Sequence, residues 1–254
     1  MNIPVVAGGG TIRTQLSEGN WILDLEFRAD VVYRNDVWVQ GRRLVLQGIN
    51  GAAGQKGRAR VAFNLRDASL QPPSEFEPGK DGVLLHPGEA AHPRWSTQLE
   101  LRVTGTPGTL GSVAVGLAPD MPTLYLAGDS TVCDQTGPDA ASWGQMLPAF
   151  FGPGLAVANH AESGETIKSF VTSLRLAKIL AGLRRDDWLL IQFAHNDQKV
   201  HRPAVYADPE FAFPAWLRVL CGEAQARGAR PLLLTPVERR NFDPAGRIVE
   251  SHGA

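Results

Sequence analysis

The chain has 254 residues, of which 43% are apolar and 20% are charged, the balance of an ordinary folded protein rather than a disordered one. Lysine and arginine number 25 against 26 aspartates and glutamates, so composition offers no basic surface for a nucleic acid. The longest apolar runs, such as residues 188–191, are too short to cross a membrane. This length allows one large domain or two modest ones.

The cysteines and the N-terminus carry little information. Cys133 and Cys221 are too few for a disulfide scaffold, and we expect both to be reduced and buried. The first eight residues lack the basic stretch and apolar segment of a signal peptide, so either the protein is cytoplasmic or a leader is missing from this chain. The six histidines show no metal-ligand spacing, and we expect no metal site.

Up to residue 119 the sequence predicts strands. Leu99, Leu101 and Val103 share one parity, with Glu100 and Arg102 on the other, as in a half-buried strand. Glycine- and proline-rich stretches separate the runs, and we expect no helix before residue 130. The expected strands are 21–27, 31–39, 43–46, 60–65, 97–103 and 113–117. Several short strands with frequent turns favour a small β-sandwich over residues 1–119.

The pattern changes at the linker 119–122. From Thr123 onward, apolar strand-like runs alternate with helical periods, which favours a parallel sheet covered by helices over residues 123–254. The expected strands are 123–127, 155–157, 188–193 and 231–237. The expected helices are 142–151, one long helix over about 167–183, and 214–226, which Gly228 ends. Ligands bind such sheets at the carboxyl ends of the strands.

Polar clusters follow three of these strands, at 128–131, 159–166 and 195–199. Each alone has a structural interpretation, as a helix cap or a turn. Together they supply a nucleophilic hydroxyl on Ser130 and donors for an oxyanion: the backbone N–H groups of Ser130 and Gly164 and the carboxamide of Asn196. The Gly-x-Ser-x-Gly elbow of other hydrolases is not present, because Thr131 and Val132 follow the serine.

From about residue 124 to its end, the chain resembles the SGNH (GDSL) hydrolase superfamily, and within it the rhamnogalacturonan acetylesterase family. The segments 126–132, 159–166, 191–199 and 236–242 carry this resemblance. It implies a three-layer α/β fold with a flavodoxin-like parallel sheet, preceded by a small all-β sandwich of the galactose-binding type.

The resemblance also implies a chemistry. A serine esterase of this kind removes O-acetyl groups from pectic rhamnogalacturonan through an acyl-enzyme on Ser130, without a metal or cofactor. Ser130, Gly164 and Asn196 would be the catalytic residues, and Asp129 and His195 would line the substrate pocket, with Asp129 holding the turn. The partner would be an acetylated plant cell-wall polysaccharide, neither a nucleic acid nor a membrane, met outside the cell or in the periplasm.

The chain departs from the family pattern in two places. Ala194 stands where the family usually has glycine, which we expect only to stiffen the loop. The family's fourth block, Asp-x-x-His, supplies the base, and it does not occur between residues 237 and 254. We therefore expect a truncated, nearly inactive form, and we do not assign His252 as the base, although His195 remains a candidate. The fourth strand would then be an uncovered edge that lowers stability or promotes oligomers.

Three alternatives stay open at this stage. The same chemistry suits an acetylesterase that acts on xylan or other acetylated sugars. A carbohydrate-binding remnant without catalysis would also account for the missing fourth block. A lipase or thioesterase is disfavoured, because no extended apolar lid segment is evident.

Overall fold

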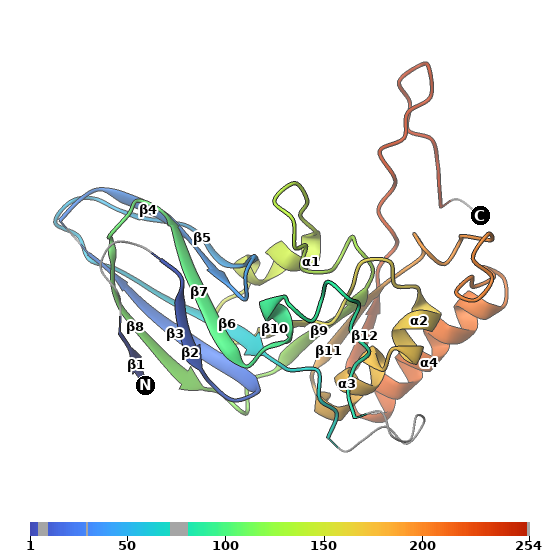
Figure 1. The fold of residues 1–254 in the computed structure, drawn as a ribbon, viewed down its shortest axis with the longest axis horizontal. Helices are drawn as coiled ribbons and strands as arrows, with labels where there is room; N and C mark the ends of the chain where they lie inside the picture. The colour runs from blue at the N-terminus through green and yellow to red at the C-terminus, as the bar shows by residue number, and fades with distance from the viewer. Residues whose placement is uncertain (5–9, 29, 72–80, 253–254) are drawn as a thin grey trace.

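The computed structural model describes residues 1–4, 10–28, 30–71 and 81–252. Up to Leu117 the chain forms two four-stranded antiparallel sheets, ordered β1-β8-β3-β6 and β2-β7-β4-β5 (Figure 1). The strands are β1 (Asn2–Ile3), β2 (Ile12–Gln15), β3 (Gly19–Phe27), β4 (Tyr33–Val39), β5 (Arg43–Gly51), β6 (Gly57–Leu65), β7 (Gln98–Gly105) and β8 (Leu110–Leu117). A short 3-10 turn, η1 (Pro93–Trp95), precedes β7.

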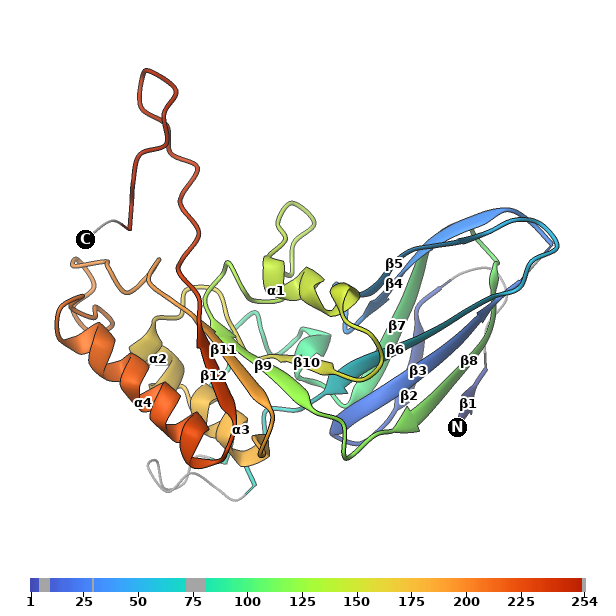
Figure 2. The ribbon, with the colours of Figure 1, turned by 180° about the vertical axis from the view of Figure 1, so that it is seen from behind.

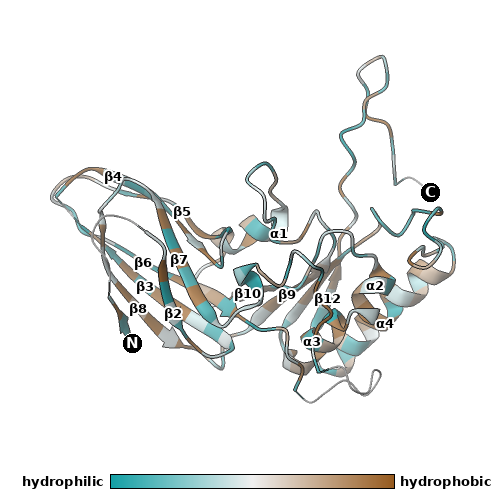
Figure 3. Cartoon of the chain, in the orientation of Figure 1, coloured by the Kyte–Doolittle hydropathy of each residue, from teal (hydrophilic) through white to brown (hydrophobic). Residues whose placement is uncertain are grey.

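The two antiparallel sheets share one apolar core. Leu23 and Leu25 of β3 meet Val37 of β4 and Leu99 and Leu101 of β7, all almost completely buried. More and less buried residues alternate along β4 and the first half of β7, as expected for strands with one face on a core. The hydropathy of the residues also changes along these strands (Figure 3). The sequence did not predict β1 and β2, because β1 has two residues and β2 is largely polar.

From Thr123 onward the structure is a mixed α/β fold around a parallel sheet, as predicted. Its strands are β9 (Thr123–Gly128), β10 (Ala156–Asn159), β11 (Trp188–Gln192) and β12 (Arg230–Leu233), in the order β10-β9-β11-β12. Helices α2 (Ile167–Thr172), α3 (Arg175–Gly182) and α4 (Ala212–Ala226) cover one face (Figure 1). Helix α1 (Trp143–Met146) and turn η2 (Leu147–Phe150) pack on the other.

The prediction of one helix over 167–183 is wrong, because the helix breaks at Leu174. That residue has φ +65°, a left-handed conformation that ends α2 and redirects the chain into α3. The carbonyl of Ser173 accepts a hydrogen bond from the N–H of Leu84, 2.9 Å away, instead of continuing a helix. The break turns α3 so that Arg175 is completely buried against the N-terminal part.

Buried ion pairs join the antiparallel sheets to the parallel sheet. Arg43 donates twice to Asp134 Oδ2, at 3.0 and 2.6 Å, and both side chains are at most 1% exposed. Arg94 contacts Glu162, and Arg175 pairs with Glu89. We call this cluster the ion-pair seam; it consists of Arg43, Arg94, Arg175, Glu89, Asp134, Glu162 and Glu165.

The far end of the parallel sheet is exposed. Strand β12 lies at the edge, as expected, and Leu232 and Leu233 are 43% and 57% exposed. Gly228 precedes it with φ +76°, the left-handed conformation expected of a residue that ends a helix. The segment that follows β12 runs away from the body of the molecule and returns through a narrow hairpin around residues 242–248 (Figure 2).

Both cysteines are free, but only Cys133 is buried; Cys221 is half-buried on the flank of α4, so the expectation of two buried thiols is correct for one. Burial raises the pKa of the Cys133 thiol to about 12, which makes it a poor nucleophile. Among the described residues, no helix is long and apolar enough to cross a membrane.

Candidate active site

The parallel sheet brings the three polar clusters to one edge. Strands β10, β9 and β11 are neighbours and run in the same direction, so the segments after them emerge side by side. The N–H of Glu162 donates to the carbonyl of Gly128 at 3.2 Å and Asn196 Nδ2 donates to the carbonyl of Glu165 at 2.8 Å, so the second segment is bonded to both of the others. The polar segments 128–131, 159–166 and 195–199 therefore form one continuous group of loops.

Asp129 holds the turn that presents Ser130. Its Oδ1 accepts from both the N–H and the hydroxyl of Thr131, each at 2.9 Å, and its carbonyl accepts from Val132 and Cys133. Asp129 is 1% exposed, which suits a residue that shapes the turn rather than one that meets solvent. Ser130 is half-buried, and within the described part of the chain its hydroxyl takes part in no hydrogen bond.

Asn196 is hydrogen-bonded to the residue that follows Gly164. Gly164 has φ +85° and is exposed, and a Cβ there would meet no atom within 4 Å. Its conformation, rather than lack of space, therefore favours glycine. Asn196 Nδ2 donates to the carbonyl of Glu165 at 2.8 Å, next to Gly164. An amide nitrogen carries two hydrogens, so one of the two stays available for a ligand.

Lys199 polarises this amide. Its Nζ donates to Asn196 Oδ1 at 2.6 Å, so the carboxamide is held from both ends. A cation on the oxygen draws electron density from the nitrogen and makes its N–H groups stronger donors. Sequence reasoning placed Lys199 in the third segment but gave it no role.

Asp197 fixes the loop after β11 through two hydrogen bonds. Asp197 accepts the N–H of Ile167 at 2.7 Å and that of Ala194 at 3.0 Å, which joins the loop to the start of α2. Burial raises the pKa of Asp197 to about 6, although these N–H bonds favour the charged form.

Ala194 has φ +136°, which only glycine adopts without strain. The expectation that alanine here merely stiffens the loop is therefore wrong: it strains it.

Two histidines stack beside this loop. The rings of His195 and His252 are 4.4 Å apart and 19° from parallel. His195 Nε2 lies 2.7 Å from the carbonyl of Val237; because a carbonyl only accepts, this nitrogen carries a proton, and the lone pair of the neutral ring is on Nδ1. Burial, with His195 nearby, lowers the pKa of His252. Sequence reasoning left His252 outside the site, and the structure brings it to His195.

The ion-pair seam holds the Gly164 loop through Glu162 and Glu165, which lie on either side of Gly164 in the chain. Glu162 accepts the N–H of Ser163 at 2.8 Å and contacts Arg94, while Glu165 accepts from Arg175 at 3.0 Å. Burial raises the pKa of Glu162 to about 8. Burial would also raise the pKa of Glu89, but the two hydrogen bonds from Arg175 lower it to about 2. Sequence reasoning missed these partners, since Arg94 and Glu89 lie far from Gly164 along the chain.

The comparisons with known proteins agree with the resemblance. No family model matches the chain. The rhamnogalacturonan acetylesterase RhgT of Bacillus subtilis (strain 168) is 41% identical over 132 residues, 51% of this chain and 55% of that protein. The probable rhamnogalacturonan acetylesterase YesY of the same organism is 39% identical over 123 residues, 47% of this chain and 56% of that protein. About half of this chain is thus similar to proteins named as rhamnogalacturonan acetylesterases.

The similarity is partial in extent. The chain spans about half the length of the curated relatives it matches. A crystal structure of the Bacillus subtilis protein YxiM covers 92% of this chain and 59% of that one, at 23% identity and a TM-score of 0.47. Within the described residues, no group of three or more His, Cys, Asp or Glu is arranged to hold a metal ion.

Proposed function

We propose that this chain supplies the nucleophile and oxyanion donors of a serine esterase that removes O-acetyl groups from pectic rhamnogalacturonan. One observation carries the proposal. Ser130, Gly164 and Asn196 follow three adjacent parallel strands, in a chain whose matched half is 41% identical to a protein named as a rhamnogalacturonan acetylesterase. From the resemblance to this family, the proposal extends to residues 1–119 as an accessory sandwich of the galactose-binding type. It also extends to the location, since a polymeric substrate is met outside the cytoplasm.

The chemistry has two steps. Ser130 Oγ attacks the acetyl carbonyl carbon while its proton passes to a base, and the N–H groups of Ser130, Gly164 and Asn196 hold the oxyanion that forms. The bond to the sugar oxygen then breaks, the sugar takes the proton, and the acetyl group stays on Ser130. Water attacks this ester in turn, which releases acetate and restores the hydroxyl.

The base sets the rate that we expect. Within the described residues, no histidine is hydrogen-bonded to Ser130, and the lone pair of His195 is on a nitrogen that makes no hydrogen bond with it. Removing a base from a triad costs several orders of magnitude, with a residual rate from the oxyanion donors. We therefore expect turnover by this chain to be slow but dependent on Ser130.

The test is acetate release from acetylated rhamnogalacturonan. Ser130→Ala is expected to reduce the release to the uncatalysed background, whereas Ser112→Ala, an exposed serine on β8, leaves it unchanged. Equal release by the unaltered chain and Ser130→Ala would contradict the proposal. Faster release from acetylated xylan than from rhamnogalacturonan would leave the chemistry standing and overturn the substrate.

A second candidate is a carbohydrate-binding protein without catalysis. The observation that favours it is the Ser130 hydroxyl, which takes part in no hydrogen bond in the described chain. This candidate predicts that immobilised pectin retains the unaltered chain and Ser130→Ala equally well, and that acetate release by either one never exceeds the background. Retention together with Ser130-dependent release would exclude it.

A further inference from the structure

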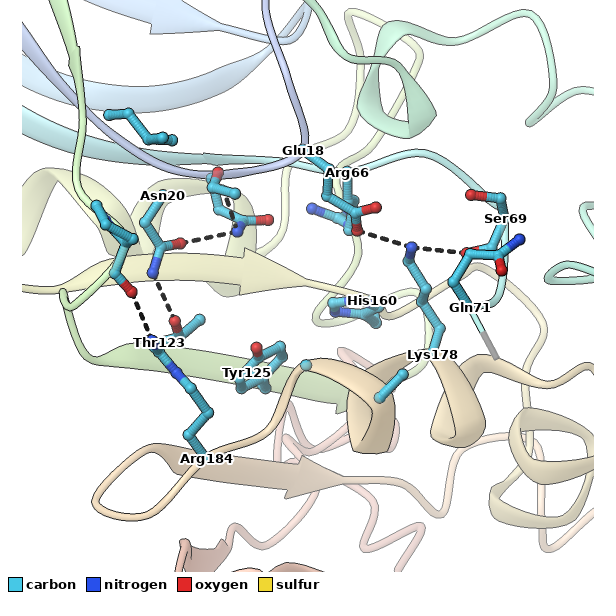
Figure 4. A pocket seen from close by; sticks show the side chains of 16 residues that line it. Glu18, Asn20, Arg66, Ser69, Gln71, Thr123, Tyr125, His160, Lys178 and Arg184 are labelled. Carbon is cyan, nitrogen blue, oxygen red and sulfur yellow. Dashed lines mark hydrogen bonds and ion pairs between the residues drawn. The ribbon is translucent and has the colours of Figure 1, made fainter. Parts of the chain in front are cut away.

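A polar cavity lies where the two parts of the chain meet. Its volume is about 410 Å³, and it is lined by Thr123 at the beginning of β9, whereas Ser130 follows the other end of that strand. Its lining also includes Arg66 and Lys178, and Lys178 pairs with Glu18 at 2.7 Å (Figure 4). The cavity is therefore separate from the candidate active site, and its lysine already has a partner. The contacts that bear on catalysis lie instead at the carboxyl edge of the parallel sheet.

The segment after β12 reaches the loops at this edge. We call residues 236–252 the arm, since they leave the body of the molecule and return through a hairpin (Figure 2). The hairpin closes between Phe242 and Ile248, which form an isolated β-bridge. Further along, the N–H and the hydroxyl of Ser251 both donate to Glu238, at 3.0 and 2.7 Å. The two ends of the arm are therefore joined to each other.

Two residues near the start of the arm hold His195. The ring nitrogen Nε2 of His195 donates to the carbonyl of Val237 at 2.7 Å, and Nη2 of Arg239 donates to the carbonyl of His195, also at 2.7 Å. His252, near the other end of the arm, stacks on the same ring. The arm thus contacts His195 at both its side chain and its backbone.

The bond from Arg239 acts on the peptide that joins His195 to Asn196. A peptide unit is planar, so a donor that fixes its oxygen also fixes the direction in which the chain enters the next residue. Arg239 is half-buried, and among the described residues it pairs with no carboxylate. Its charge is therefore directed at this carbonyl, and a hydrogen bond from a charged donor is about twice as strong as one between neutral groups.

The side chain of Asn196 is held from the other direction by two bonds. Its Nδ2 donates to the carbonyl of Glu165 at 2.8 Å, and its Oδ1 accepts from Lys199 at 2.6 Å. These bonds set the plane of the carboxamide, whereas Arg239 sets the backbone from which the side chain projects. Both matter for catalysis, because a misplacement of about 1 Å in an active site can reduce the rate about 10²-fold.

We propose that Arg239 is a positioning residue for the oxyanion donor Asn196, through its hydrogen bond to the His195 carbonyl. The inference rests on the proposed function, since Asn196 acts as an oxyanion donor only in that reaction. It also gives a role to the segment 236–242, which contributes to the family resemblance but supplies neither the nucleophile nor a donor.

Turnover of two substrates tests the proposal. Arg239→Gln removes the charge and shortens the side chain, and it should lower kcat about tenfold or more on both acetylated rhamnogalacturonan and 4-nitrophenyl acetate, with little change in KM. The oxyanion is common to the two reactions, whereas a contact of Arg239 with the sugar would affect only the first. Arg239→Lys, which keeps a charged donor, should recover part of the loss. Arg240→Gln, at the exposed neighbouring position, is the matched control and should leave both rates unchanged.

The side-chain amide resonances of Asn196 in an NMR spectrum test the same contact without turnover. They are identified by their absence from the spectrum of Asn196→Ala. Arg239→Gln should shift these resonances, Arg239→Lys should shift them less, and Arg240→Gln should leave them in place.

Three results would overturn the assignment: a loss on rhamnogalacturonan alone, a rise in KM with unchanged kcat, and Asn196 resonances that Arg239→Gln does not move. Absence of Ser130-dependent acetate release would overturn the proposed function instead, and the amide resonances would still decide whether Arg239 positions Asn196. Should Arg239→Gln lose its fold, seen as a lost melting transition, Arg239→Lys replaces it in each comparison.

Discussion

The antiparallel sheets and the ion-pair seam show two different ways to bury side chains. Inside the sheets, Leu23, Val37 and Leu99 make an apolar core, and the arginines of β6 pair with carboxylates of β3 at the surface, as in Arg60–Asp24. In the seam the arginines themselves are buried, and Arg43 and Arg175 are at most 1% exposed. Apolar side chains can pack in several relative orientations, whereas a hydrogen-bonded ion pair requires a particular geometry of its two groups. The seam therefore fixes how the two parts are oriented.

The largest expected effect comes from breaking the seam. Arg175→Met leaves Glu89 and Glu165 buried without their cation, which should lower the free energy of unfolding by about 3–5 kcal/mol. Arg60→Met removes a pair that is 62% and 42% exposed and should cost less than about 1 kcal/mol. Urea unfolding of both variants measures the difference, and equal costs would remove the distinction between seam and surface.

The next effect compares two apolar positions. Leu101→Ala opens a cavity in the core of the antiparallel sheets, where Leu101 is 0% exposed, and should cost about 2–5 kcal/mol. Leu233→Ala on β12, at 57% exposure, should change the free energy of unfolding by about 0.5 kcal/mol or less. A large loss from Leu233→Ala in a concentration-dependent unfolding experiment would instead show that another copy of the chain covers this edge.

A pH titration contrasts two buried carboxyls. Asp197 has a pKa of about 6, above the ~3.9 of an unfolded aspartate, so between about pH 4 and 6 the folded state holds a proton that the unfolded state has released. Its contribution therefore falls as the pH rises through this window, by about 2–3 kcal/mol. Glu89, with a pKa of about 2, has the opposite sign: its contribution is present above about pH 4.5 and is lost as the pH falls towards 2.

Unfolding measured from pH 2 to 7 checks both signs. Asp197→Asn should reduce the fall in stability between pH 4 and 6, to which the raised pKa of Glu162 also contributes, and leave the loss of stability at lower pH in place. A variant that keeps the full slope of the unaltered chain would contradict the contribution of Asp197.

The smallest expected effect is a gain. Ala194→Gly relieves a residue held at φ +136° and should raise the free energy of unfolding by about 1 kcal/mol. Ala215→Gly, at an exposed position within α4, is the matched control and should lower it by about 0.5–1 kcal/mol. If both variants lose stability, the strain at Ala194 is not real.

Much of the fold was predictable because its signals are local. Alternation marked most of the antiparallel strands, and apolar runs marked the four parallel ones. The break at Leu174 was not, because apolar residues keep the helical spacing across it. The structure adds a hydrogen bond from the N–H of Leu84 to the Ser173 carbonyl at this point, a long-range contact that the local pattern does not contain.

The candidate site divides in the same way. That Ser130, Gly164 and Asn196 follow strands ending at one edge could be predicted from the sequence, because parallel strands end at one edge; their catalytic role stays a prediction. The partners beneath them were not found: Glu89 and Arg175 are separated by 86 positions, and nothing in either neighbourhood indicates the other. Cavities such as the one lined by Arg66 are equally invisible in a sequence, since five segments distant along the chain enclose it.

The seam also bears on how this protein can be divided or recombined. A shortened protein that starts at Thr123 would keep Asp134 and Glu162 but lose Arg43 and Arg94, which would leave the Asp134 carboxylate without its cation and Glu162, beside the Gly164 loop, without its contact. Exchanging the first 119 residues for another module would succeed only if the replacement brought equivalent cations. The two parts look separable in the sequence, but their buried ion pairs make each depend on the other.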